Sequence, residues 1–145
     1  MKTSLQEVLH SEIPITKEIG ISVSEYTGDS LTLLAPLENN LNHKCTAFGG
    51  SLYSVSVLSG WGLLYLLLEE NALLGHIVIQ ESNTKFLKPV ESDLSATCAF
   101  ESTEQREKFI KMFKRKGLAR IKLTSRVSCG GDEHVLFNGS YVVHK

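Results

Sequence analysis

Apolar and polar residues alternate along several parts of the chain, and this spacing predicts β-strands. The alternation covers residues 19–24, 31–35, 94–100, 119–127 and 135–143, which is typical of strands that bury one face and expose the other. Residues 76–87 predict one further strand, which Pro89 closes. Gly28 and Asp29 provide a turn between the first two strands. The pattern therefore predicts six strands, joined mostly by tight turns.

The most apolar stretch, residues 55–68, predicts a buried helix. Serines and glycines interrupt it, and it is shorter than the roughly 20 residues that a membrane span requires. A helix that is apolar on nearly every side must be covered, and a curved antiparallel sheet can wrap around it. We therefore expect an α+β hotdog fold, with about six strands around one long central helix, as a single domain over residues 1–145.

The N-terminal residues predict one short additional helix. Ser4 and Glu7 have the spacing of a capping box ahead of an apolar pair, so we expect a helix over residues 4–12 that Pro14 ends. A sheet wrapped around one helix leaves an edge strand and part of the helix uncovered. We therefore expect two copies to pair edge to edge, as a homodimer or a dimer of dimers.

Composition narrows the functional classes without naming one. The chain has 15 basic and 16 acidic residues and a net charge of -1, so nothing global indicates binding to nucleic acid or to a membrane surface. Three cysteines without a CxxC pair make a disulfide framework or zinc site improbable and agree with a cytoplasmic location. The histidines have no metal-ligand spacing, so we expect no metal.

Residues 42–53 carry the most informative motif. Gly49 and Gly50 lie where the central helix is expected to begin, so their backbone amides would be free and at the positive end of the helix dipole. Such amides suit an oxygen that becomes negative when a carbonyl, for example that of a thioester, is attacked. The alternative is that the two glycines only permit a tight bend from loop to helix.

Three segments resemble the hotdog-fold acyl thioesterases, especially the bacterial group similar to the C-terminal thioesterase domain of YiiD. They are N-x-x-x-T-x-F-G-G-S-L-Y at 42–53, G-W-G at 60–62 and N-T-K-F-L-K-P at 83–89. The resemblance implies hydrolysis of an acyl thioester of coenzyme A or acyl carrier protein by water activated at a subunit interface. It implies no separate cofactor, since coenzyme A or the carrier's pantetheine is part of the substrate.

The resemblance also assigns roles to individual residues. Asn42 falls where broader relatives place an Asn that positions water or substrate, and Gly50 falls at their oxyanion-hole donor. Phe48 stands where many relatives have His, and Val57 stands where an acid is often found. Phe48, Gly49, Tyr53 and Asn83 are expected to contact substrate. Because Val57 cannot accept a proton from water, another residue must do so.

Two residues are candidates for that proton transfer. Ser54 shares the helix face of Val57 and could hold water or act as a nucleophile, or it could simply bond its own i−4 carbonyl. Glu81 has the strand parity of Ile77 and Ile79, which would give it apolar neighbours and a raised pKa. Glu81 could instead be a solvated edge-strand residue or pair with Lys85. Asn83 has the same parity and could assist by hydrogen bonding.

Two further features leave alternatives open. His43 and Cys45 could form a nucleophilic pair, but no third residue orients them, so an exposed His43 and a packed Cys45 is the competing interpretation. Residues 106–116 carry six cations and one Glu and predict a helix inserted between two strands. Its cations are either solvated or dock phosphates of coenzyme A or the acidic face of an acyl carrier protein.

These observations favour a thioester hydrolase that uses Asn42, Gly50, and Glu81 or Ser54. One alternative is a non-catalytic acyl-thioester binding or regulatory module, which Val57 at the usual acid position would suit. The other is a 3-hydroxyacyl-thioester dehydratase, which requires a His and acid pair that the motifs do not provide.

Overall fold

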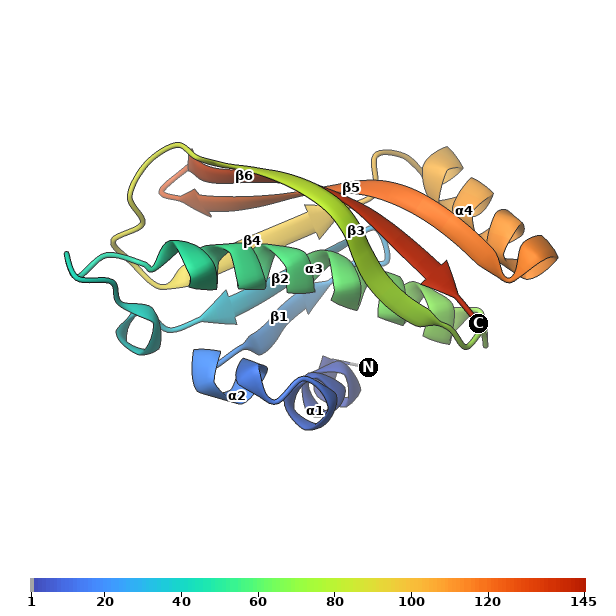
Figure 1. Cartoon of the computed structure of the whole chain (residues 1–145), viewed down its shortest axis with the longest axis horizontal. Helices are drawn as coiled ribbons and strands as arrows, with labels where there is room; N and C mark the ends of the chain where they lie inside the picture. The colour runs from blue at the N-terminus through green and yellow to red at the C-terminus, as the bar shows by residue number, and fades with distance from the viewer. Residues whose placement is uncertain (1) are drawn as a thin grey trace.

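The computed structural model describes residues 2–145, with side chains from residue 5 onward, and it contains four α-helices, one 3-10 helix and six strands (Figure 1). In chain order they are α1 (Lys2–Glu12), α2 (Ile15–Ile19), β1 (Ser22–Tyr26), β2 (Ser30–Ala35), η1 (Leu37–Asn40), α3 (Gly49–Glu70), β3 (His76–Phe86), β4 (Leu94–Ala99), α4 (Thr103–Lys116), β5 (Leu118–Cys129) and β6 (Asp132–His144).

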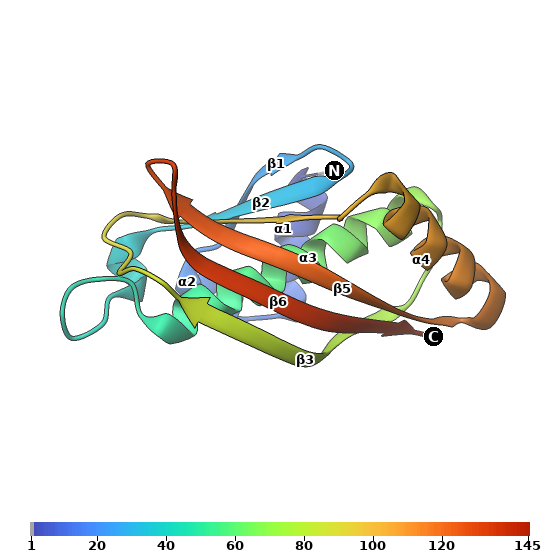
Figure 2. The ribbon, with the colours of Figure 1, turned by 90° about the horizontal axis from the view of Figure 1, so that it is seen from above.

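The six strands form one antiparallel sheet in the order β1-β2-β4-β5-β6-β3. Figure 2 shows α3 running along one face of the curved sheet, with α4 at the end of the sheet where α3 finishes. This is the hotdog fold that the sequence predicts. The order makes β1 and β3 the edge strands, and β3 and β6 are long partners that curve around α3 (Figure 1).

The N-terminal region differs from the prediction at the start of both its first helix and its first strand. Ile19 was expected to begin the first strand, but it ends the short helix α2, and β1 starts only at Ser22. Gly20 causes the change, because its left-handed conformation (φ 80°) lets its amide close the helix on the carbonyls of Thr16 and Lys17. The proposed Ser4 cap lies outside the side chains that the structure describes, and α1 already begins at Lys2.

The long helix α3 is the centre of the core. Its buried residues pack against apolar side chains from β2 to β6 and from α1, including Leu5, Leu31, Phe137 and Tyr141. Among the described residues, α3 is the helix that is long and apolar enough to span a membrane, but 67% of its apolar window is buried inside the fold. Burial of this extent is typical of a core helix.

One side of α3 is not covered by the sheet. Tyr53, Ser54, Val57, Trp61 and Tyr65 recur every three or four residues and remain partly exposed along this side. We call this stripe the open face of α3. Trp61 reaches from it to donate a 3.1 Å hydrogen bond to the carbonyl oxygen of Ile77 on β3. The open face therefore adjoins the edge strand β3.

Candidate active site at the start of the central helix

The first two backbone amides of α3 are free. Phe48 precedes the helix in an extended conformation (φ −66°, ψ 132°), and the amides of Ser51 and Leu52 both donate to its carbonyl oxygen at 3.0 Å. The amides of Gly49 and Gly50 come before that point and have no acceptor within residues 2–145. They lie where the helix dipole places partial positive charge. The pair can therefore stabilise a developing negative charge on an oxygen.

Two exposed aromatic rings flank these glycines. Phe48 is 53% exposed and Phe86 is 54% exposed. A Cβ added to Gly50 would lie 2.5 Å from Cε2 of Phe48, whereas one added to Gly49 would lie 3.8 Å from Cε1 of Phe86. Gly50 thus allows the Phe48 ring to lie directly against the start of the helix. The rings form apolar walls beside the free amides.

Asn42 shapes the loop before the helix. Its Oδ1 accepts hydrogen bonds from the amides of Lys44 (2.8 Å) and Thr46 (3.1 Å). Its Nδ2 donates to the hydroxyl of Thr46 (2.8 Å) and the carbonyl of Ala47 (3.4 Å). The side chain predicted to position water therefore makes four contacts inside its own loop. This observation shows a structural role, and its role toward substrate stays a prediction.

The hydroxyl of Ser54 is also engaged. It donates a 2.8 Å hydrogen bond to the carbonyl oxygen of Gly50, four residues earlier, which is the alternative anticipated from the sequence. Tyr53 lies beside it, and its hydroxyl is 3.0 Å from that of Ser82 on β3. The Tyr53 ring packs edge-on against Phe137, with 5.7 Å between centroids. A pair of hydroxyls is thus present one helical turn beyond Gly50.

A β-bulge changes which residues of β3 face the helix. Ile79 pairs with Tyr141 and Glu81 pairs with Ser140, so Gln80 is an extra residue in β3. An extra residue reverses the alternation of side chains beyond it. Glu81 consequently does not share the face of Ile79, and it is exposed on the outer side of the sheet. The apolar surroundings predicted for Glu81 are wrong for this reason.

The same reversal applies to Asn83, which pairs with Asn138 and is exposed. The residues that turn toward α3 are instead Ser82, Thr84 and Phe86, opposite the buried Gly139, Phe137 and Val135. The Oγ1 atom of Thr84 is buried and has no hydrogen-bond partner among the described residues. The sequence contains no local signal for the bulge, so simple alternation missed these inner-face positions.

The remaining candidate groups do not assemble into a second reactive centre. His43 and Cys45 are both exposed, and Cys45 has a positive φ of 63° within the loop that Asn42 holds. The three cysteines are free thiols, and burial raises the pKa of the Cys98 thiol to about 12. No group of three or more potential metal-binding side chains occurs in the described part of the chain.

Solved structures of other proteins share this fold over nearly the whole chain. A protein of unknown function from Chlorobaculum tepidum is 36% identical, with a TM-score of 0.93 and coverage of 99% of this chain and 94% of the other. The "putative thioesterase from Shewanella oneidensis" is 28% identical, with a TM-score of 0.91 and coverage of 99% and 97%. A thioesterase from Haemophilus influenzae is 15% identical (TM-score 0.73, coverage 99% and 90%), which shows the fold alone.

A family model points to the same class of protein as these structures. The model described as "Putative thioesterase (yiiD_Cterm)" matches residues 2–145. The family and the fold together support a thioester hydrolase role. The chain belongs to this YiiD C-terminal thioesterase family.

Proposed function

We propose that the protein hydrolyses acyl thioesters of coenzyme A or of acyl carrier protein, with Gly49 and Gly50 as the oxyanion hole. The observation that carries the proposal is the pair of unpartnered amides at the start of α3. When water attacks the thioester carbonyl, the carbonyl oxygen becomes negative, and the two amides donate hydrogen bonds to it. The thiol of the carrier then leaves and the acyl group departs as a carboxylic acid.

The surroundings of the amides suit the other parts of this substrate. The exposed rings of Phe48 and Phe86 provide an apolar surface for the acyl chain. The hydroxyls of Tyr53 and Ser82 can orient the attacking water because each both donates and accepts hydrogen bonds. Asn42 acts through the loop, which it holds in the shape that delivers Phe48 and the glycines.

The proposal includes a homodimer formed through β3. Exposed apolar residues gather along this edge strand and at its ends: Leu74 (89% exposed), Val78, Phe86 and Leu87. The open face of α3 adjoins the same edge. An unpaired edge beside exposed apolar residues is a preferred surface for self-association. Mass measurement in solution should give about twice 16.0 kDa.

The proton acceptor must come from outside the open face of α3. Residues 50–65 contain no carboxylate and no imidazole. The candidates that we consider are His43, which is exposed in the loop before α3, and groups supplied by a second copy. A pH–rate profile of His43→Gln separates these two sources, because loss of the base removes one limb of the profile.

Turnover is tested with acyl-coenzyme A substrates of short, medium and long chain, with release of free thiol as the readout. The proposal requires steady release at catalytic enzyme concentrations. Tight binding of the same substrates without thiol release would instead identify an acyl-thioester binding module, which Val57 at the usual acid position would suit. Loss of water from a 3-hydroxyacyl thioester would identify a dehydratase.

A cytoplasmic location is part of the proposal, and the three free thiols support it.

A further inference from the structure

A basic groove lies between α4 and β5, away from the glycine pair. Its volume is about 690 Å³. Six cations line it, four from the helix and two from the strand: Lys108, Lys111, Arg115, Lys116, Arg120 and Lys122. No carboxylate is among its lining residues. The chain as a whole has a net charge of -1, so this groove concentrates positive charge locally.

The six cations of the groove form no ion pair with the described residues. The ion pairs of the described residues involve Lys88, Arg106 and Arg126, and none includes a cation of the groove. The dipole of α4 accounts for positive charge in its last turn, where Arg115 and Lys116 lie. It does not account for Lys111, or for Arg120 and Lys122 on a strand. The groove therefore carries charge that the fold does not require.

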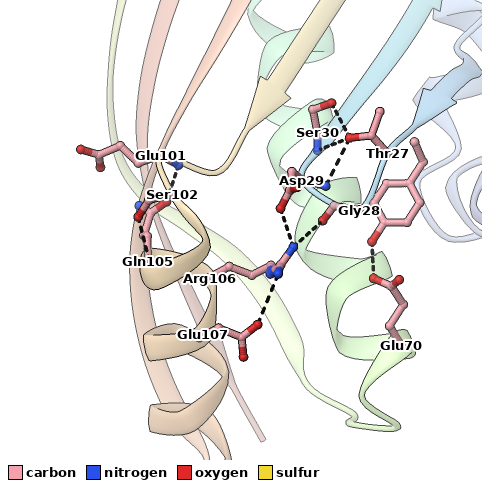
Figure 3. A network of polar contacts seen from close by, with 11 residues as sticks. Thr27, Gly28, Asp29, Ser30, Glu70, Glu101, Ser102, Gln105, Arg106 and Glu107 are labelled. Carbon is pink, nitrogen blue, oxygen red and sulfur yellow. Dashed lines mark hydrogen bonds and ion pairs between the residues drawn. The ribbon is translucent and has the colours of Figure 1, made fainter.

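The helix that forms one wall is firmly anchored. Figure 3 shows Arg106 bridging to Asp29 and to the carbonyl of Gly28 in the β1–β2 turn. Ser102 caps the helix by accepting from the amide of Gln105 (3.0 Å), and Gln105 also donates to the carbonyl of Lys122 on β5 (2.8 Å). Phe109, Ile110 and Phe113 are buried beneath. The two walls are thus held in a fixed arrangement before any ligand binds.

The residues that line the groove favour an acidic helix over a nucleotide as its negatively charged partner. A nucleotide is usually held by stacking of its base and by helix N-terminal amides, but the only aromatic residue lining the groove, Phe109, is 3% exposed. The exposed apolar residues are Met112 (37%) and Leu118 (45%). Cations on two walls around apolar side chains suit an amphipathic acidic helix.

We propose that this groove docks the acidic helical face of an acyl carrier protein that delivers the thioester, an inference that rests on the proposed function. Within one chain, α3 separates the groove from the glycines, and its 22 residues span roughly 33 Å. Antiparallel pairing of two β3 edges places the Phe86 end of one copy beside the His76 end of the other. Phe86 lies against Gly49, and His76 lines a pocket with Phe113 and Lys114 of α4. The carrier docks on one copy, and its acyl thioester is hydrolysed at the glycine pair of the other.

The first experiment compares one acyl group on two carriers. The variant Lys111→Gln/Arg120→Gln removes one charge from each wall and so lowers the net charge by two, and Lys17→Glu, at an exposed lysine on α2, lowers it by the same amount and is the matched control. We expect the double variant to lose at least about tenfold in kcat/KM for the carrier-protein thioester and to keep the coenzyme A thioester within about twofold. An equal loss of kcat/KM with both carriers would assign the groove to the phosphates of coenzyme A and would overturn the proposal. Unchanged kcat/KM with both carriers would also overturn it.

Binding provides a readout that does not depend on hydrolysis. Titration of holo-acyl carrier protein into the wild-type protein should give a Kd that weakens as salt is raised, and the double variant should weaken it at least about tenfold. Unchanged binding overturns docking in the groove. If wild type binds the carrier but hydrolyses no thioester, the proposed function fails while docking stands.

Delivery between copies is tested by mixing two defective proteins. The groove variant retains a normal helix start, and Gly49→Pro, which removes one of the two free amides, retains a normal groove. In a mixed dimer, delivery between copies restores one complete site, so random mixing should recover about a quarter of wild-type activity toward the carrier-protein thioester. Delivery within one copy leaves no complete site in the mixed dimer. Activity that stays at the level of the separate variants would therefore overturn delivery between copies.

Discussion

The hydroxyl of Tyr141 on β6 donates a 2.7 Å hydrogen bond to the carbonyl oxygen of Val57 in the middle of α3. Gly60 makes this contact possible, because a Cβ at that position would lie 2.3 Å from the Tyr141 hydroxyl and 2.6 Å from the ring carbon that bears it. The ring is fully buried, and burial raises the pKa of the phenol. This contact fixes α3 against the sheet, about two turns beyond the glycine pair.

Gly60→Ala should therefore destabilise the protein more than Tyr141→Phe. The added methyl group meets a buried ring that cannot move freely, so we expect a loss of about 2–3 kcal/mol in the free energy of unfolding. Tyr141→Phe removes only the hydrogen bond and should cost about 1–2 kcal/mol. Denaturant unfolding measures both variants. A Gly60→Ala protein as stable as wild type would show that α3 does not approach β6 this closely.

Residues on the two faces of β3 should differ in their effect on turnover. Ser82 faces α3 and contacts Tyr53, so Ser82→Ala should lower kcat by about tenfold through loss of an oriented water. Glu81 is exposed on the outer face, so Glu81→Gln should change kcat less than about twofold. A loss of 100-fold or more for Glu81→Gln would restore the catalytic role that the sequence suggested.

Asn42 variants separate a loop-shaping role from a direct contact with substrate. An Asp side chain at this position can still accept hydrogen bonds from the amides of Lys44 and Thr46, whereas an Ala side chain has no acceptor. We expect Asn42→Ala to lose more activity than Asn42→Asp and to increase hydrogen exchange of the amides of residues 44–46. Full protection of those amides in an inactive Asn42→Ala protein would instead indicate a direct role at the substrate.

Alkaline conditions should destabilise the fold, because burial raises the pKa of the Cys98 thiol. Burial raises the pKa of Cys98 from 9.0 to about 12, so above about pH 9 the unfolded thiol releases its proton and the folded thiol does not. Stability then falls as pH rises, by at most about 1.4 kcal/mol per pH unit for one such group. Cys98→Ala should reduce this slope between pH 9 and 11. The control Cys45→Ala removes an exposed thiol and should leave the slope unchanged.

The sequence predicted those parts of the structure that depend on regular spacing. Alternation of apolar and polar residues predicted five of the six strands, the longest apolar stretch predicted the central helix, and the run of cations between two strands predicted the inserted helix. The free amides of Gly49 and Gly50 could also be predicted, since they follow from the position of a helix start.

The failures have local causes that spacing does not reveal. Gln80 is an ordinary polar residue, yet as the extra residue of a bulge it turns Glu81 outward and Ser82 inward. Gly20 was interpreted as part of a strand because its left-handed conformation depends on the contacts that close α2. The four hydrogen bonds of Asn42 form only in the folded loop. The residue type alone therefore suggested a role toward water or substrate and did not reveal its role in holding the loop.

The most direct test of the proposed oxyanion hole removes the backbone N–H of Gly49. A side chain is tolerated better there than at Gly50, where a Cβ would lie 2.5 Å from the Phe48 ring. Proline fits at residue 49, because it is the first helical position and Phe48 already has the extended conformation that precedes proline. The matched variant Gly49→Ala keeps the amide, and its Cβ would make an ordinary 3.8 Å contact with Phe86. We predict that Gly49→Pro lowers kcat for acyl-thioester hydrolysis by about 100-fold with little change in KM, while Gly49→Ala loses less than about tenfold. A folded Gly49→Pro protein that turns over thioesters at the wild-type rate would contradict the oxyanion hole proposed for this pair.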